Sequence, residues 1–206
     1  MRLPGARAQD ADTMGKRILV IDGHPDPARG RLVHALADQY AAAAESGGHL
    51  VQIVRLCEFE FPWLRSAKEF AARPLGMIGS QQEHFRWADH LVIVYPLWLG
   101  SMPALLKAYL EQVLRPGFAF AYGKGRGLPQ QLLTGKSARI VVTMGMPSLF
   151  YRLYYRSHSV RSLARNILGF VGFKPVRVTL IGNVEGSASA RKHSIDELLA
   201  HARRGE

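Results

Sequence analysis

Five short apolar runs alternate with helical patterns along the chain, and they predict five β-strands. The runs are Arg17–Asp22, Leu50–Leu56, Leu91–Tyr95, Arg139–Met144 and Val176–Ile181. Strands that alternate with helices are typical of a parallel α/β sheet. The hydrophobic pattern therefore predicts an α/β fold.

The character of each run predicts its place in the sheet. The first, third and fourth runs are continuously apolar at their centres, as strands covered on both faces are, whereas the second and fifth alternate apolar with polar residues. Placing the alternating runs at the edges gives the order 2-1-3-4-5. This is the flavodoxin-like doubly wound order, with helices on both faces and a ligand crevice between the first and third strands.

The segments between the runs carry helix signals. An apolar stripe at i+4 spacing predicts a helix that ends at two glycines, Gly47 and Gly48. The stripe consists of Leu32, Leu36, Tyr40 and Ala44. Pro103 is suited to the opening of a helix. Ser194, followed three residues later by Glu197, predicts a capping box that begins the last helix.

Length and charge narrow the class of protein. The chain has 206 residues, 48% of them hydrophobic, which favours one packed domain over 16–206 after a disordered extension at 1–15. Its net charge of +11 predicts attraction to anions such as phosphorylated ligands, acidic membranes or nucleic acid.

Cysteine content and hydropathy bear on location. The one cysteine, Cys57, cannot form an internal disulfide, and no segment approaches a membrane span or a signal sequence. We therefore expect a cytoplasmic protein without a membrane span. No metal site is predicted.

The loop after the first strand offers groups that suit a phosphate. It contains His24, Arg29, Gly30 and Arg31 just before a helix. Backbone N–H groups at a helix start, together with arginine, favour phosphate binding. A proline-rich loop with solvated arginines is an equal alternative.

The loops after the third and fourth strands are unusually apolar. Their candidate residues are Pro96, Leu97, Trp98, Leu99, Thr143, Met144, Gly145 and Met146. Such loops indicate a flat apolar ligand, with core packing as the alternative.

Two short motifs give no support to other nucleotide-binding classes. Gly135-Lys136-Ser137 resembles the tail of a P-loop, but it precedes a strand and position 130 is Gln. The first loop also lacks the GxGxxG fingerprint of a Rossmann dehydrogenase. Neither class is therefore predicted.

A longer pattern resembles a known family. The strand end Gly23-His24-Pro25-Asp26-Pro27, then Gln82, Ala88-Asp89 and the block PLWLGSMPALLKAYLEQVLRPGFAF at 96–120, are similar to the NAD(P)H:quinone oxidoreductase family of flavodoxin-like flavoproteins. That family includes modulators of drug activity and potassium-efflux ancillary proteins. The resemblance extends from about Lys16 to about Arg203.

The resemblance implies FMN, or alternatively FAD, as the cofactor and NAD(P)H as co-substrate. It implies a ping-pong transfer of hydride to a quinone-like or other small electron acceptor. By position, the first loop would hold the phosphate, the amides of Leu97, Trp98 and Leu99 would support the flavin ring, and the loop at 143–146 would border its pyrimidine edge.

Further roles follow from the same resemblance. Tyr151 and His158 match catalytic positions that face the flavin, and Phe120 and Tyr122 match aromatics that reach the substrate pocket of a neighbouring subunit, which implies a homodimer. The chain departs from the family where many relatives have Thr-Thr-Gly-Gly, because it has methionines at 144 and 146. It also has Arg29 and Arg31 where relatives have serine and asparagine, which leaves FMN and FAD both open.

Two other functions remain as alternatives. The chain could be a regulatory binding module of a larger system such as a potassium-efflux channel. Nucleic-acid binding rests on charge alone and is disfavoured, since no recognition helix or aromatic platform is evident.

Overall fold

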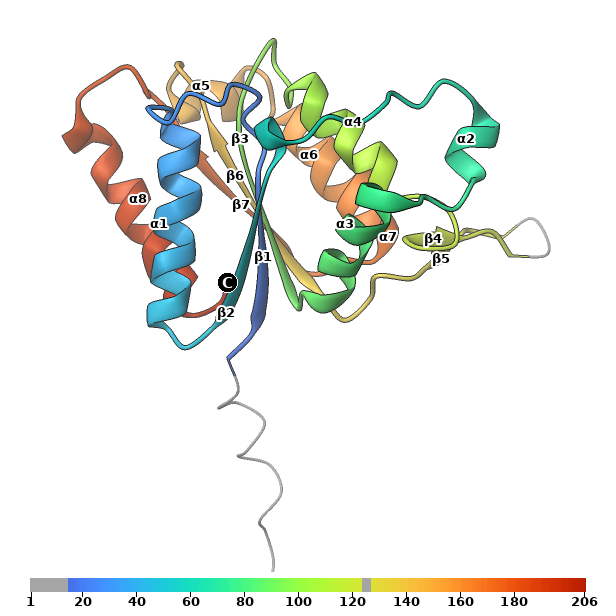
Figure 1. Cartoon of the computed structure of the whole chain (residues 1–206). Coiled ribbons are helices and arrows are strands. Elements are labelled where there is room, and N and C mark those ends of the chain that lie inside the picture. Colours follow the sequence, from blue (N-terminus) through green and yellow to red (C-terminus); the bar gives the residue numbers. More distant parts are fainter. Residues whose placement is uncertain (1–14, 124–126) are drawn as a thin grey trace, which may run out of the picture.

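One parallel sheet in the order β2-β1-β3-β6-β7 organises the computed structural model, which describes residues 15–123 and 127–206 (Figure 1). The predicted strand order and fold class are confirmed. The strands of this sheet are β1 (Arg17–Asp22), β2 (Leu50–Arg55), β3 (His90–Pro96), β6 (Ser137–Thr143) and β7 (Val176–Ile181). The extension predicted at 1–15 lies, apart from residue 15, outside the described residues, so that boundary stays a prediction.

Burial explains why the apolar pattern predicted the strand order. Strands β1, β3 and β6 are buried along nearly their whole length, whereas β2 and β7 are largely half-buried or exposed. All four pairings are parallel and in continuous register. The two alternating runs are therefore the edge strands, as predicted.

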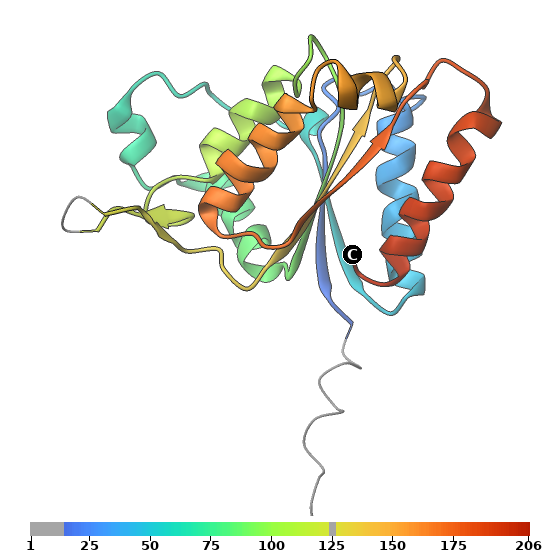
Figure 2. The ribbon, with the colours of Figure 1, turned by 180° about the vertical axis from the view of Figure 1, so that it is seen from behind.

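Helices cover both faces of the sheet (Figures 1 and 2). Helices α1 (Leu32–Ser46) and α8 (Ala188–Arg203) lie on one face. The other face is covered by α3 (Gly76–Trp87), α4 (Ala104–Val113), α6 (His158–Ser162), the π-helical turn η2 (Leu163–Leu168) and α7 (Gly169–Val171). A separate apolar core fills each side.

Smaller elements complete the chain. They are a 3-10 turn η1 (Leu56–Glu58), α2 (Ala67–Ala71), α5 (Ser148–Leu153) and an antiparallel pair of β4 (Phe120–Ala121) with β5 (Gln130–Gln131). Strands of two residues are too short to leave a period in the sequence, so this pair was not predicted.

The predicted helix ends were right at α1 and wrong at α8. Gly48 follows α1 with φ of 84°, the left-handed conformation that glycine adopts most easily. Helix α8 begins at Ala188, so Ser194 lies inside the helix and caps nothing. The apolar stripe of α8 begins only near Leu198, so the sequence pattern placed the start of this helix too late.

In the described ranges, no helix is long and apolar enough to cross a lipid bilayer.

His90, at the start of β3, is a buried base with one unused nitrogen. Its side chain is 2% exposed, Nδ1 lies 2.7 Å from the Ser137 hydroxyl, and Nε2 has no partner. Burial lowers the pKa of His90 to about 3, and the positive charges of Lys16, Arg139 and Arg177 contribute. The folded protein therefore keeps this ring neutral.

We predict acid lability from His90. The pKa of His90 is about 3 in the folded protein and near 6.5 in the unfolded chain. Between these two pH values the unfolded chain binds a proton at His90 and the folded protein does not, so a falling pH favours unfolding. Stability should be full above pH ~6.5 and should fall by up to about 1.4 kcal/mol per pH unit toward pH 3. Urea unfolding at a series of pH values measures this slope.

A His90→Gln variant should flatten the slope while keeping a donor or acceptor for Ser137. The exposed His193, changed to Gln, is the matched control and should leave the slope as in the parent protein. An equal slope in all three proteins would contradict the assignment to His90.

Candidate functional site

Backbone hydrogen bonds join the loops that follow β1, β3, β6 and β7 at the carboxyl edge of the sheet. The Gly23 amide donates to the Val94 carbonyl at 2.8 Å, the Leu97 amide to the Thr143 carbonyl at 2.8 Å, and the Met144 amide to the Ile181 carbonyl at 2.9 Å. These loops lie at one end of the sheet in Figure 1. Ligands of doubly wound sheets bind at this edge.

The loop after β1 is organised by Asp22, a fully buried carboxylate. Its Oδ2 lies 2.5 Å from Nδ1 of His34 in α1 and accepts from Nη1 of Arg55 in β2 at 3.1 Å. Its Oδ1 accepts the His24 amide at 3.2 Å. A buried charge needs such partners, so helix, strand and loop are all held by one side chain.

His34 extends this network into the loop. Its second nitrogen, Nε2, lies 2.9 Å from the Asp26 carbonyl, and the ring is buried. A carbonyl only accepts, so Nε2 must carry a proton and donate. The loop backbone is thereby tied to α1.

His24 is held as a neutral donor. Its Nδ1 accepts the Asp26 amide at 3.1 Å, so in the neutral ring the proton sits on Nε2. Burial, with the neighbouring His34 contributing, lowers the pKa of His24. The ring packs edge-on against Trp98 with centroids 5.7 Å apart, which brings the first and third loops together.

The two arginines of this loop differ in their partners. Arg31 donates to Asp26 through Nε at 2.8 Å and forms an ion pair with the same carboxylate. Arg29 is exposed and forms no ion pair within the described ranges. Gly30 has open space where a Cβ would lie. Arg29 is therefore the cation of this loop that is available to an anion.

The loop after β3 makes a tight turn. Trp98 and Ser101 exchange two backbone hydrogen bonds at 2.9 Å, and Leu99 and Gly100 between them have φ of 46° and 78°. Successive left-handed residues form a type I′ turn, which is unfavourable for leucine. Leu99 is nevertheless fully exposed at the tip, so it gains no burial there.

Only one of the three predicted ring-supporting amides is free. The Leu97 amide is used by Thr143 and the Trp98 amide by Ser101, whereas the Leu99 amide has no partner among the described residues. In the loop after β6, Gly145 and Met146 likewise have unpartnered amides. Met144 is 2% exposed and packs in the core. This departure from the family's Thr-Thr-Gly-Gly pattern therefore places the Met144 side chain in the core.

Tyr151 requires a correction. It is completely buried, and its hydroxyl lies 2.6 Å from the hydroxyl of Ser159, so the catalytic role predicted for it has no access to a ligand. Tyr155 lies edge-on to Tyr154 with ring centroids 5.0 Å apart, and Tyr154 is 71% exposed. The accessible aromatic surface of this segment therefore belongs to other tyrosines.

His158 is exposed at the start of α6, with Nδ1 3.0 Å from the Tyr155 carbonyl. The neutral ring therefore donates through Nδ1 and keeps Nε2 as an acceptor. The predicted proton-partner role for His158 stays a prediction.

Phe120 and Tyr122 lie apart from the carboxyl edge. They line a cavity of about 270 Å³ with Leu110 and Leu114 of the α4 end and Phe170 of α7. Phe120 is buried and Tyr122 is 71% exposed. The structure thus does not bring these aromatics to their own chain's candidate site.

The sequence interpretation missed Asp22, His34 and Arg55. The available signals were weak: a carboxylate closing an apolar strand, a histidine within the apolar face of a helix, and an arginine at a strand end. Only the three-dimensional pairing of β1 with β2, which sets Asp22 opposite Arg55, reveals the cluster.

Comparison with known proteins supports the fold and suggests a chemistry. A family model described as a flavodoxin-like fold matches residues 16–204. An uncharacterized NAD(P)H oxidoreductase of Haemophilus influenzae is 29% identical over 88% of this chain and 91% of its own length. An NAD(P)H:quinone oxidoreductase from Methanothermobacter marburgensis has a similar structure, with a TM-score of 0.78, 22% identity, and coverage of 93% of this chain and 100% of that one.

A third relative names a cofactor. An FMN-dependent NADH:quinone oxidoreductase of Colwellia psychrerythraea is 31% identical over 56% of this chain and 53% of its own length. The chain spans little more than half the length of several curated relatives that it matches. Their activities are therefore a basis for a proposal about this chain.

We predict unequal costs for two carboxylates that share Arg55. Asp22→Asn leaves His34 and Arg55 without their buried partner and should lower the free energy of unfolding by about 3 kcal/mol. Asp38→Asn removes a second ion pair of Arg55, at a carboxylate whose side chain is 56% exposed, leaves the third one with Glu58, and should cost less than about 1 kcal/mol. Urea unfolding of both variants at pH 7 checks this; equal costs would count against the network.

Proposed function

The chain belongs to the flavodoxin-like fold family, and from that premise we propose that it is an FMN-dependent oxidoreductase that transfers hydride from NADH or NADPH to a quinone-like acceptor. The observation that carries the proposal is the set of donors at the carboxyl edge of the sheet that have no partner among residues 15–123 and 127–206. The relatives named above as NAD(P)H and NADH oxidoreductases support the chemistry.

The donor set fits FMN. A phosphate monoester needs a cation and neutral N–H donors, which Arg29 and the Nε2 of His24 provide. A flavin ring needs an apolar bed and backbone donors at its polar edge. The exposed Trp98 and Leu99 provide the bed, and the unpartnered amides of Gly145 and Met146 provide donors.

Bound FMN would supply hydride transfer, which is the cofactor's own chemistry. The chain's residues would position it and handle charge. The Gly145 and Met146 amides would stabilise negative charge at the pyrimidine edge, as preorganised dipoles do. Because the pKa of His24 is lowered, its ring would stay neutral above that pKa. It would then donate a hydrogen bond to the phosphate without contributing a positive charge.

NAD(P)H and the acceptor would use one face in turn, which is a ping-pong mechanism. The exposed turn at Trp98 and Leu99 and the ring of Tyr154 offer apolar surface for either planar reactant. His158 is the proposed proton partner of the reduced acceptor: with Nδ1–H bonded to the Tyr155 carbonyl, the doubly protonated ring would donate a proton from Nε2 to the acceptor oxygen and would be left as the neutral ring. We place this reaction in the cytoplasm, in keeping with the free thiol of Cys57.

We further propose that two copies form a homodimer with shared sites. The cavity lined by Phe120, Phe170 and the exposed Tyr122 is mostly apolar and lies away from the chain's own carboxyl edge. In the proposed dimer, Tyr122 would reach the site of the other copy. Light scattering of the purified protein measures the assembly, and a monomer at catalytic concentration would exclude shared sites.

The direct test of the cofactor is to purify the protein and identify the released chromophore by mass. Arg29→Gln should then weaken FMN binding about tenfold or more, because a charge-assisted hydrogen bond is lost. Riboflavin, which lacks the phosphate, should bind the variant and the parent equally. Flavin fluorescence quenching measures both affinities.

Arg73→Gln is the matched control, since Arg73 is also exposed and without an ion pair in the described residues. It should bind FMN as the parent does. An equal loss for riboflavin in Arg29→Gln would show that the loop, rather than the phosphate contact, is damaged.

The buried position of Tyr151 yields a separate prediction. Tyr151→Phe should leave NADH:quinone turnover within about twofold, because the hydroxyl is buried and its one hydrogen-bond partner in the described part of the chain is Ser159. The free energy of unfolding should fall by about 1 kcal/mol, the usual net value of one hydrogen bond. Steady-state kinetics and urea unfolding measure the two effects, and a hundredfold loss of turnover would restore a catalytic role for Tyr151.

A further inference from the structure

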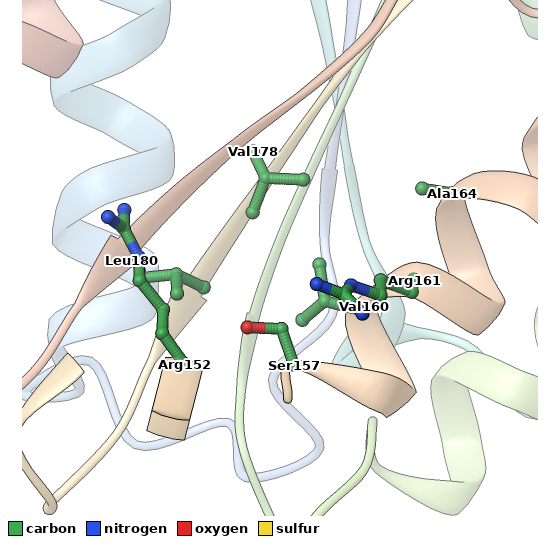
Figure 3. Close-up of a pocket in the computed structure, with 7 residues that line it drawn as sticks. All are labelled: Arg152, Ser157, Val160, Arg161, Ala164, Val178 and Leu180. Atoms are coloured by element: carbon green, nitrogen blue, oxygen red, sulfur yellow. The ribbon is translucent and has the colours of Figure 1, made fainter. Parts of the chain in front are cut away.

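A second pocket lies on edge strand β7, outside the residues proposed to bind FMN. Its volume is about 330 Å³, which falls within the roughly 300–1,000 Å³ of small-molecule pockets. The lining residues come from α5, the turn before α6, α6 itself, η2 and β7 (Figure 3); they are Arg152, Ser157, Val160, Arg161, Ala164, Val178 and Leu180.

The floor of this pocket is apolar and open. Val160, Ala164, Val178 and Leu180 provide it, and Val178 is 39% exposed. Strand β7 is the edge strand of the sheet. No further strand, and no helix that would follow such a strand, therefore covers its outer edge. The pocket therefore offers hydrophobic contact to a small apolar body.

The polar groups of the pocket are two arginines and a hydroxyl. Figure 3 shows Ser157 between Arg152 and Arg161, with its hydroxyl on the side that faces Arg152 and with the Arg152 guanidinium extending past Leu180. Neither arginine forms an ion pair or a side-chain hydrogen bond within the ranges that the structure describes. A pocket lined by a hydroxyl and by two arginines that have no carboxylate partner among the described residues favours an anionic ligand.

The backbone that presents Ser157 is strained. Arg156 and Ser157 both have φ of 50°, a conformation that costs a non-glycine residue about 1 kcal/mol or more. The only backbone bond from the Ser157 amide to a described residue goes to the Tyr151 carbonyl at 3.3 Å. Strained residues of this kind cluster at functional sites.

We propose that this pocket binds a small amphipathic carboxylate. The carboxylate would lie between Arg152 and Arg161 and accept from Ser157, and the apolar body would cover Val178 and Leu180. Guanidinium groups pair with carboxylates in a bidentate way, which favours this head group over a neutral amide or alcohol. The site is separate from the one proposed for FMN and does not depend on that proposal.

The test uses 2-naphthoate as the probe and neutral 2-naphthamide as its isostere. Calorimetric titration is carried out on the full chain with and without saturating FMN. We expect one naphthoate per chain, an affinity at least about tenfold higher than that of the amide, and the same affinity with and without FMN. Chemical-shift changes should be centred on Ser157 and Val178.

Three variants locate the binding. Arg152→Gln and Arg161→Gln should each weaken naphthoate binding about tenfold, and both side chains are on exposed helix positions where Gln is tolerated. Arg165→Gln is the matched control, because Arg165 is exposed on the next turn and does not line the pocket. Val178→Glu should abolish naphthoate binding by placing a carboxylate in the floor.

Several results would overturn the proposal. Equal affinity for the amide would show that charge is not recognised, and an equal loss in Arg165→Gln would reduce the effect to general charge. Competition by FMN would assign the probe to the flavin site. Self-association that blocks the probe would identify the pocket as an interface between copies.

Discussion

The carboxylate of Asp22 is the constraint on which the candidate site depends. It ends the first central strand with no exposed surface, so its charge must be balanced by protein groups. Those groups come from three directions, because His34 belongs to α1, Arg55 to β2 and the His24 amide to the loop itself. Each partner fixes one side of the loop, and His34 passes the constraint on to the Asp26 carbonyl. The loop that would hold a phosphate is thereby ordered before any ligand binds, which reduces the entropy lost on binding.

Internal hydrogen bonds also order the other loops at this edge of the sheet. Hydrogen bonds between Leu97 and Thr143, and between Met144 and Ile181, continue the sheet pairing past the ends of the strands. Beyond these bonds, the amides of Leu99, Gly145 and Met146 have no partner among the described residues. Donors therefore face outward where the sheet pattern stops. Leu99 has an unfavourable left-handed backbone conformation, and its apolar side chain is fully exposed at the tip of the turn after β3. The strain is therefore not offset by burial of this side chain.

The sequence predicted the features that follow from repeated, local patterns. Strand order could be deduced because burial on two faces or one leaves a visible difference between runs such as 91–95 and 176–181. The position of the three loops followed from that order. The identity of the groups inside the site did not, because Asp22 and Arg55 are 33 residues apart and meet only through strand pairing. Tyr151 was misjudged for a related reason, since spacing along a helix-rich segment gives no sign of which face is covered by Ser159 and the core.

The distribution of paired and unpaired arginines gives the net charge of +11 a structural meaning. Arg17, Arg31 and Arg55 are each matched by a carboxylate, so they add little to the field outside the protein. Arg29, Arg152 and Arg161 are exposed and form no ion pair in the described residues. A neighbouring carboxylate would neutralise the charge of such an arginine and would occupy its hydrogen-bond donors. The excess charge therefore reaches solvent at particular loops and helix faces at the carboxyl edge and beside β7, where it can attract anions of the kind that phosphates and carboxylates provide.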